Sequence, residues 1–196
     1  MHVDIGCGNG RFAVDLAAAR PSLRVLGIDI RAGVVDRARE RLALRGGLPN
    51  CAFVTGNASA GLRALLSGVH VHGVSVLHPD PWFKSRAHKR RVVSAQFLGD
   101  VAGVLPSGAR VWLQTDAAVL FESFLEAAAN AGPLYRLLEP PEVEREWAAA
   151  GLPCTDRERA VRAHGGAIYR TLLERTAVVA AGAAAATLQA RATIMP

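Results

Sequence analysis

What this sequence lacks excludes several classes of protein. Its three cysteines, Cys7, Cys51 and Cys154, form no CxxC pair and no Cys/His ligand spacing, which argues against a disulfide framework, a zinc site or a catalytic Cys/His dyad. The first residues carry no basic and apolar leader, and the chain shows no internal repeat. The Ala-rich stretch 177–190 is shorter than a membrane span and only weakly hydrophobic. We therefore expect a cytoplasmic protein without a metal site or a membrane segment.

Short apolar runs alternate along the chain with amphipathic stretches, as is typical of a parallel sheet flanked by helices. The expected strands are 3–5, 24–30, 52–55, 70–77, 109–114, 135–138 and 167–173. The expected helices are 11–20, 31–45, 59–67, 92–105 and 117–131. No second domain is indicated, so we expect one domain over residues 1–176, followed by an Ala-rich tail, 177–196, that is disordered or a frayed helix.

A glycine-rich loop separates the first expected strand from the first expected helix. Gly6, Gly8 and Gly10 would permit a tight turn and a close approach of backbone N–H groups to a ligand. Their G-x-G-x-G spacing differs from the G-x-G-x-x-G fingerprint for a pyrophosphate. S-adenosylmethionine has no phosphate, and its sulfonium and amino groups favour a carboxylate such as Asp4, directly before the loop. The loop therefore favours S-adenosylmethionine over a dinucleotide.

Polar residues follow the ends of several expected strands. Asp29 is placed to accept the ribose hydroxyls of an adenosine, and the alternative is an acid that caps a helix. Asn57 is placed to meet adenine, or else is a turn residue. Asp80 and Asp116 lie just past two further strand ends. Since open α/β sheets bind ligands at this edge, we expect four acids, Asp4, Asp29, Asp80 and Asp116, to converge on one crevice.

The segment from His78 to Arg91 combines a rigid acid with dense positive charge. Pro79 and Pro81 leave Asp80 few backbone options, and Trp82 follows at once. Five Lys or Arg residues lie within residues 83–91, in a chain with a formal net charge of +6. This combination favours a nucleic-acid site in which the segment binds a nucleobase and the neighbouring backbone phosphates. The alternative is a solvated basic loop in which Trp82 only packs.

Together these segments resemble a known family. The motifs are Asp4-Ile-Gly-Cys-Gly-Asn-Gly-Arg, Gly27-Ile-Asp-Ile-Arg, Pro79-Asp-Pro-Trp-Phe-Lys with His88-Lys-Arg-Arg, Thr115-Asp116, and Thr155-x-x-Glu158 followed by Gly166-x-Ile-Tyr-Arg. From Val3 to Arg175 the chain resembles the tRNA (guanine-N7)-methyltransferases of the bacterial single-subunit kind, also found in organelles. The resemblance implies an α/β, Rossmann-like class I methyltransferase fold, with a mostly parallel seven-stranded sheet and helices on both faces. It also implies methyl transfer from S-adenosyl-L-methionine to N7 of guanine 46 in the variable loop of tRNA.

The resemblance also implies roles for single residues. The expected cofactor contacts are Asp4, Gly6, Gly8, Gly10, Asp29, Asn57 and Asp80. The expected tRNA contacts are Lys84, His88, Lys89, Arg90, Arg91, Asp116, Thr155 and Glu158. Asp80 is also the expected catalytic residue. Because guanine N7 carries a lone pair and no proton, we expect Asp80 to hold the guanine or to balance positive charge, and not to abstract a proton.

The chain departs from the family pattern at a few positions. Asp4 and Asp29 stand where Glu is usual, Asn57 where Asp is usual, and Arg157 where an aromatic residue is usual. The usual N-terminal arm before the first strand is absent from this sequence, which fits either a truncated chain or a version that lost the arm. An organellar location is the alternative if a leader is missing.

Three other functions are compatible with parts of the sequence. They are methylation of an exocyclic amine, an NAD-dependent oxidoreductase activity, and RNA binding without catalysis. We expect a monomer or a homodimer, and a partner subunit is not excluded.

Overall fold

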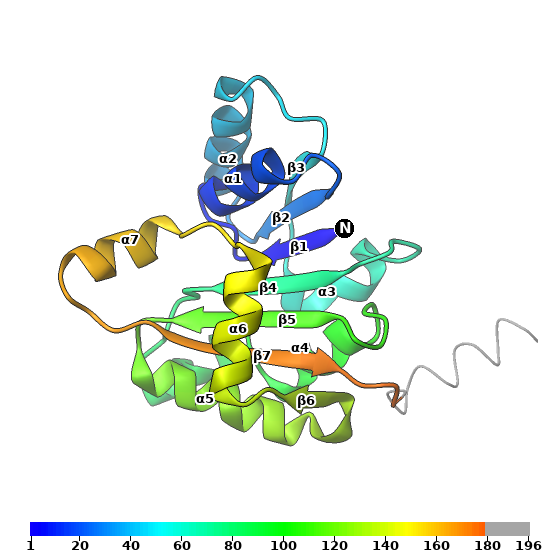
Figure 1. Cartoon of the computed structure of the whole chain (residues 1–196), viewed down its shortest axis with the longest axis vertical. Helices are drawn as coiled ribbons and strands as arrows, with labels where there is room; N and C mark the ends of the chain where they lie inside the picture. Colours follow the sequence, from blue (N-terminus) through cyan, green and yellow to red (C-terminus); the bar gives the residue numbers. More distant parts are fainter. Residues whose placement is uncertain (179–196) are drawn as a thin grey trace, which may run out of the picture.

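The computed structural model describes residues 1–178, in which seven strands form one sheet (Figure 1). The strands are β1 (His2–Ile5), β2 (Val25–Asp29), β3 (Cys51–Thr55), β4 (Gly73–Leu77), β5 (Arg110–Thr115), β6 (Tyr135–Leu137) and β7 (Tyr169–Arg175). Their order is β3-β2-β1-β4-β5-β7-β6, and β7 runs antiparallel to both of its neighbours while the pairs from β3 to β5 are parallel. The predicted fold class is confirmed.

Helices cover both faces of the sheet in the described residues. They are α1 (Arg11–Ala19), α2 (Ala32–Leu44), α3 (Ala58–Leu65), α4 (Ala95–Ala102), α5 (Ala118–Asn130), α6 (Pro140–Ala150) and α7 (Asp156–Ala163), with 3-10 turns η1 (Ser85–Arg90) and η2 (Gly132–Leu134). Helices α3, α4 and α5 pack on one face, whereas α1, α2 and α6 pack on the other. Figure 1 shows α7 beyond the carboxyl ends of β4 and β5.

The core follows from the alternation of side chains along each strand. In β1, Val3 and Ile5 enter the larger cluster under α3 to α5, together with fully buried Phe97 and Phe124. The intervening Asp4 faces the other side of the sheet. Burying each large apolar side chain contributes about 2–3 kcal/mol, so this two-sided core fixes the strands whose ends form the site.

The predicted elements agree with the structure up to residue 138, apart from their ends. Helix α4 begins three residues later than expected because the Ser94 hydroxyl caps it, accepting from Phe97 N at 3.1 Å. Helices α6 and α7 were not predicted. Both carry a start signal: a capping box between Glu139 and Glu142, and Thr155, whose hydroxyl accepts from the Glu158 N–H.

The end of the chain is only partly described. From residue 179 on, the predicted Ala-rich tail lies outside the described residues. Within residues 1–178, none of the helices is long and apolar enough to cross a membrane.

Candidate functional site

The glycine-rich loop connects β1 to α1, and three of its glycines have a left-handed backbone conformation. Gly6, Gly8 and Gly10 have φ of 72°, 55° and 76°, a region that side chains other than glycine enter at a cost. At Gly10 a Cβ atom would also lie 2.6 Å from Cζ of Phe53. At Gly6 the same atom would meet nothing within 4 Å, so the loop leaves open space at the start of the crevice.

Asp29, at the end of β2, holds this loop in place. Its carboxylate accepts from the Gly8 N–H at 3.1 Å and from the backbone N–H and Nε of Arg31 at 3.0 and 3.2 Å. Burial alone would raise the pKa of Asp29, but the hydrogen bonds from Arg31 and Gly8 bring it below its ordinary value. An ionised acceptor that lines a cavity suits a pair of ribose hydroxyls. Arg31, with a side chain 59% exposed, currently covers that acceptor.

Asp4 lies beneath the crevice, outside the lining of its cavity. It is 3% exposed, and its carboxylate accepts from the Ser75 hydroxyl at 2.8 Å. On the far side of Ser75, Nε2 of the equally buried His2 lies 3.0 Å from the same hydroxyl. Burial raises the pKa of Asp4 to about 7, and the nearby charge of Asp29 adds to the effect. The predicted cofactor contact of Asp4 stays a prediction.

A cavity of about 910 Å³ opens at the carboxyl ends of β1, β2 and β4. Four of the seven predicted cofactor residues line it: Gly6, Asp29, Asn57 and Asp80. Four of the predicted tRNA residues also line it: His88, Lys89, Arg90 and Arg91. Residues of α5, such as Ser123 and Asn130, also line it. The structure therefore brings basic residues 88–91 and the predicted adenosine contacts, Asp29 and Asn57, around the same cavity.

The loop that carries Asp80 is constrained at both ends. His78 and Trp82 are the non-glycine residues of positive φ in the described chain, at 51° and 44°, a conformation that costs about 1–2 kcal/mol for each residue. Arg91 donates from Nε to the Pro81 carbonyl at 3.0 Å, and the guanidinium of Arg90 lies 4.9 Å from the centre of the Trp82 ring. Two of the basic residues thus brace this loop.

His78 is the anchor of that loop, and sequence reasoning missed it. Its backbone N–H donates to the Gln114 carbonyl at 2.7 Å, and its side chain is 5% exposed. The Gln114 side-chain oxygen accepts from Arg170, which turns the Gln114 amide N–H groups toward Glu158 and toward Nε2 of His78. Nε2 therefore accepts, and His78 is the neutral tautomer with its proton on Nδ1.

The Nδ1–H of His78 donates to Asp116 at 3.0 Å, so this histidine ties the end of β4 to the end of β5. Burial lowers the pKa of His78 despite the neighbouring carboxylate of Asp116. Burial would raise the pKa of Asp116, but hydrogen bonds from Arg157 and His78 lower it. The pair is thus a neutral imidazole beside a carboxylate.

A second cavity, of about 310 Å³, adjoins the first. It is lined by the acids Asp80 and Asp116, the exposed ring of Phe83, and Arg157 from α7. His78, Pro79 and Asp80 line both cavities. Asp80 therefore lies at the junction of a large and a small binding space.

Helix α7 closes the small cavity from outside the sheet. Arg157 donates from Nη2 and Nε to Asp116 at 2.6 and 3.1 Å. Glu158 points inward, is 2% exposed, and accepts from Gln114, Arg162 and Arg170. The structure places Thr155 as the cap of the helix, and the predicted tRNA contacts of Thr155 and Glu158 stay predictions. No group of three or more His, Cys, Asp or Glu side chains in residues 1–178 is arranged to hold a metal ion.

Comparisons with known proteins agree with this architecture. A family model described as putative methyltransferase matches residues 1–171. A tRNA (guanine-N(7)-)-methyltransferase of Thermosynechococcus vestitus is 38% identical over 178 residues, which cover 91% of this chain and 81% of that protein. A protein of the same name from a Nostoc species is 35% identical over 182 residues, covering 90% and 80%.

Solved structures show the same fold at lower identity. The aminoglycoside resistance methyltransferase NpmB1 has a TM-score of 0.56 at 22% identity, over 89% of this chain and 86% of its own. The 16S rRNA methyltransferase KamB has a TM-score of 0.57 at 21% identity, over the same shares. Sheet order, site position and family match agree, so the chain belongs to the tRNA (guanine-N7)-methyltransferase family, within the class I methyltransferase fold.

Proposed function

We propose that this protein transfers the methyl group of S-adenosyl-L-methionine to N7 of guanine 46 in the variable loop of tRNA. The observation that carries the proposal is the place of Asp80, which lines both the large and the small cavity. The large cavity would hold the cofactor and the small cavity the guanine. Methyl donor and acceptor would then meet beside one carboxylate. We further expect the protein to be cytoplasmic.

The residues of the large cavity fit the proposed cofactor, which supplies an electrophilic methyl group on a positive sulfonium. Asp29 would accept the ribose hydroxyls in place of the Arg31 guanidinium, whose exposed side chain can turn away. Asn57 lies at the carboxyl end of β3, on the cavity wall, where its amide can meet adenine. The open space at Gly6 admits a ligand close to the backbone.

The small cavity suits a guanine presented by its N7 edge. The N1 and N2 groups of guanine are donors, and Asp80 is an acceptor in the wall. Because N7 has no proton to lose, the residues need only align the base and balance the positive charge that moves onto the purine. Asp80 would either hold the guanine through N1 and N2 or balance that positive charge. The exposed ring of Phe83, 69% accessible, offers a stacking surface at the same cavity.

The test is methyl transfer to unmodified tRNA with labelled S-adenosylmethionine. N7-methylguanosine is recognised by chain cleavage after borohydride reduction, and a transcript in which adenine replaces guanine 46 should accept no label. Asp80→Ala should lower transfer by at least about a hundredfold, as expected when the charge and position of a reacting group are lost. Glu144→Ala, which removes an exposed carboxylate on α6, is the matched control and should retain activity.

Two results would refute the proposal. Label that resists reductive cleavage would indicate methylation of an exocyclic amine. Binding of tRNA without any transfer or cofactor binding, measured by calorimetry with S-adenosylmethionine, would indicate an RNA-binding relative without catalysis.

A further inference from the structure

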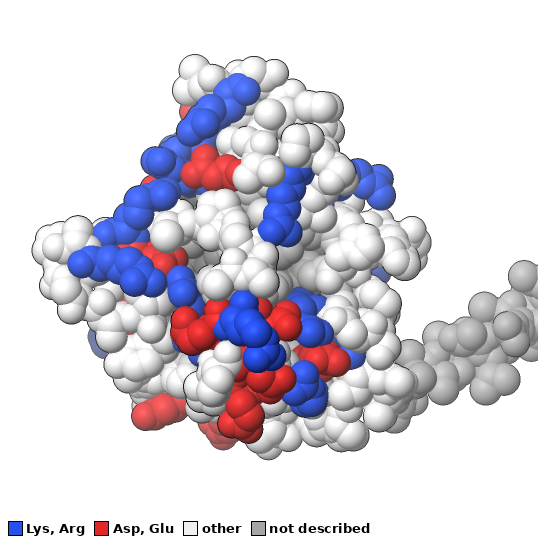
Figure 2. Space-filling model, viewed as in Figure 1, with Lys and Arg blue, Asp and Glu red and all other residues white. Residues whose placement is uncertain are grey.

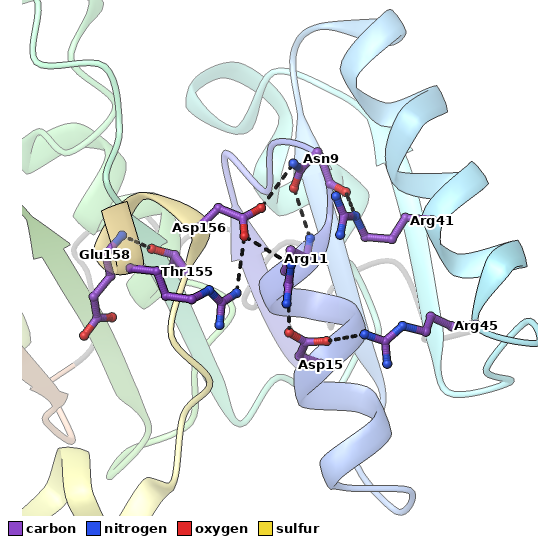
Figure 3. A network of polar contacts seen from close by, with 9 residues as sticks. Asn9, Arg11, Asp15, Arg41, Arg45, Thr155, Asp156 and Glu158 are labelled. Atoms are coloured by element: carbon purple, nitrogen blue, oxygen red, sulfur yellow. Dashed lines mark hydrogen bonds and ion pairs between the residues drawn. The ribbon is translucent and has the colours of Figure 1, made fainter. Parts of the chain in front are cut away.

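Four arginines from three distant parts of the chain meet on one side of the glycine loop. They are Arg11 of α1, Arg41 and Arg45 at the end of α2, and Arg159 of α7, and we call them the arginine face. Figure 3 shows two carboxylates among them: Asp15 lies between Arg11 and Arg45, and Asp156 lies beside Arg11, while Arg41 contacts Asn9. Folding thus creates a basic surface that no linear run of the sequence contains.

Each carboxylate on this surface serves more than one guanidinium. Asp15 pairs with Arg11 at 3.3 Å and with Arg45 at 3.6 Å. Asp156 pairs with Arg11 at 3.5 Å and with Arg159 at 3.3 Å, and also accepts from Asn9. Four arginines against two aspartates leave a net charge of +2. The pairs therefore hold the arginines in place without cancelling their charge.

The arginines also keep donors available to a ligand. The side chains of Arg11, Arg45 and Arg159 are 37%, 54% and 42% exposed. Within the described chain, Arg41 is held through Nε, which donates to the Asn9 carbonyl at 3.1 Å. A guanidinium has five N–H groups in a planar fork that matches phosphate oxygens. Because these groups are already positioned, binding costs less side-chain entropy than it would from free arginines.

Helix α7 connects the arginine face to the small cavity. Its residue Asp156 pairs with Arg11 of the arginine face, whereas the next residue, Arg157, lines the small cavity and pairs with Asp116. Figure 2 shows the corresponding band of blue, which runs from α1 and α2 down to α7. His88 to Arg91, from the basic loop of residues 84–91, line the large cavity. An RNA with one base in the small cavity therefore has positive charge on two sides.

We propose that the arginine face is a second RNA-binding surface, which binds backbone phosphates of the tRNA beyond the nucleotide that is methylated. This proposal rests on the proposed function, because it takes tRNA as the substrate. The tRNA backbone is a polyanion. It suits this surface because the surface is exposed, has a net positive charge, is rich in N–H donors for phosphate oxygens, and is continuous with the small cavity. It predicts that the enzyme prefers a whole folded tRNA to a short fragment with the same target guanine.

The test compares two pairs of substitutions that remove the same charge. Arg41→Gln with Arg45→Gln alters the arginine face while leaving Arg11, Asp156 and α7 untouched. Arg63→Gln with Arg136→Gln removes two exposed, ion-paired arginines of α3 and β6 and is the control. Glutamine keeps a high helix propensity, and thermal melting checks that both proteins fold. Binding of unmodified whole tRNA and of a short variable-loop hairpin is measured across a series of salt concentrations.

The arginine-face variant should bind whole tRNA about tenfold more weakly at low salt and lower the log–log salt slope by about 1.5–2, as for two lost phosphate contacts. Its affinity for the hairpin and its kcat at saturating tRNA should stay within about twofold of the unmodified protein. The control should retain the slope. The proposal is overturned if both variants lose affinity equally, since net charge alone would then act. It is also overturned if neither loses affinity, because the arginine face would then make no phosphate contact.

Failure of this proposal differs from failure of the proposed function. If methyl transfer to tRNA occurs but the arginine-face variant binds like the control, only the second surface is wrong. If the slopes differ as expected but no methyl is transferred, the surface stands as an RNA site and the proposed reaction is wrong.

Discussion

Replacing His78 tests how the strained loop controls Asp80. In His78→Ala the residue keeps its unfavourable φ of 51° and loses the hydrogen bonds of both ring nitrogens to Asp116 and Gln114. A bond to a charged group contributes about 1.5–3 kcal/mol and a neutral one about 1 kcal/mol. The expected loss of stability is therefore about 2–4 kcal/mol, measured by urea unfolding.

Two further variants separate stability from positioning. His78→Gly removes the cost of the left-handed backbone and should be about 1 kcal/mol more stable than His78→Ala, yet it leaves the loop equally unanchored. His78→Asn tolerates positive φ, and its amide N–H can replace the Nδ1–H that donates to Asp116. Asparagine should therefore restore both the conformation and the tie between β4 and β5.

The kcat of these variants should depend on whether residue 78 still donates a hydrogen bond to Asp116, and not on the stability of the protein. Displacing a reacting group by about 1 Å can cost a hundredfold in rate, so His78→Ala and His78→Gly should both lower kcat by roughly that factor. Their KM for S-adenosylmethionine should change less than kcat, because Asp29 on β2 and Asn57 after β3 lie outside the altered loop, whereas Asp80 lies within it. His78→Asn should recover at least about tenfold of the lost kcat. The reasoning fails if folded His78→Ala keeps kcat within threefold, or if the asparagine variant is no better than alanine.

Three other predictions concern the core of the site. Because burial raises the pKa of Asp4 from 3.8 to about 7, its contribution to stability is present below pH 3.8 and is lost as pH rises through 7. Asparagine at position 4 cannot titrate. From pH 4 to pH 8, the free energy of unfolding of Asp4→Asn should therefore rise relative to that of the original protein by up to about 4 kcal/mol, measured by urea unfolding. Parallel pH dependences of the two free energies would contradict this. Gly10→Ala places a Cβ 2.6 Å from Phe53 at a φ of 76° and should cost about 2–4 kcal/mol, against about 1–2 kcal/mol for Gly6→Ala, where space is open, both measured by thermal melting. Cys154 is exposed and the other two cysteines are buried, so a thiol reagent should modify one cysteine in the native protein and three after denaturation.

The sequence predicted the sheet well because its strands are continuous apolar runs that end in glycine, proline or an acid. The residues at those ends, Asp29, Asn57 and Asp80, do line one cavity. Asp4 does not, and the reason is its depth along the strand. Asp4 pairs with Gly27, two residues before Asp29, and Ile5 still follows it in β1. Asp4 therefore faces the same side of the sheet as Asp29 but lies below the strand end that the cavity reaches.

Other features of the site could not be predicted from local sequence. The left-handed backbone of His78 has no local signature. The partners that stabilise it, Gln114 on β5 and Asp116 just past its end, are 36 and 38 residues away. Glu158 resembles an exposed binding residue in a charged segment, but three side chains that converge in the fold satisfy it as a buried acid. The pattern Thr155-x-x-Glu158 did contain a helix start, which would have located α7.

Helix α7 couples the two halves of the site through polar contacts alone. It is eight residues long, and Glu158 is its buried residue, so neither helix propensity nor an apolar face can hold it in place. Its first turn reaches the glycine loop through Asp156, and its next residue reaches Asp116 at the small cavity. Because exposed ion pairs are individually weak, these two contacts position α7 together with the buried bonds that Glu158 accepts from Gln114 and Arg170. We therefore expect a change in the glycine loop to alter the small cavity through this helix, and Arg159 and Arg11 of the arginine face lie on that path.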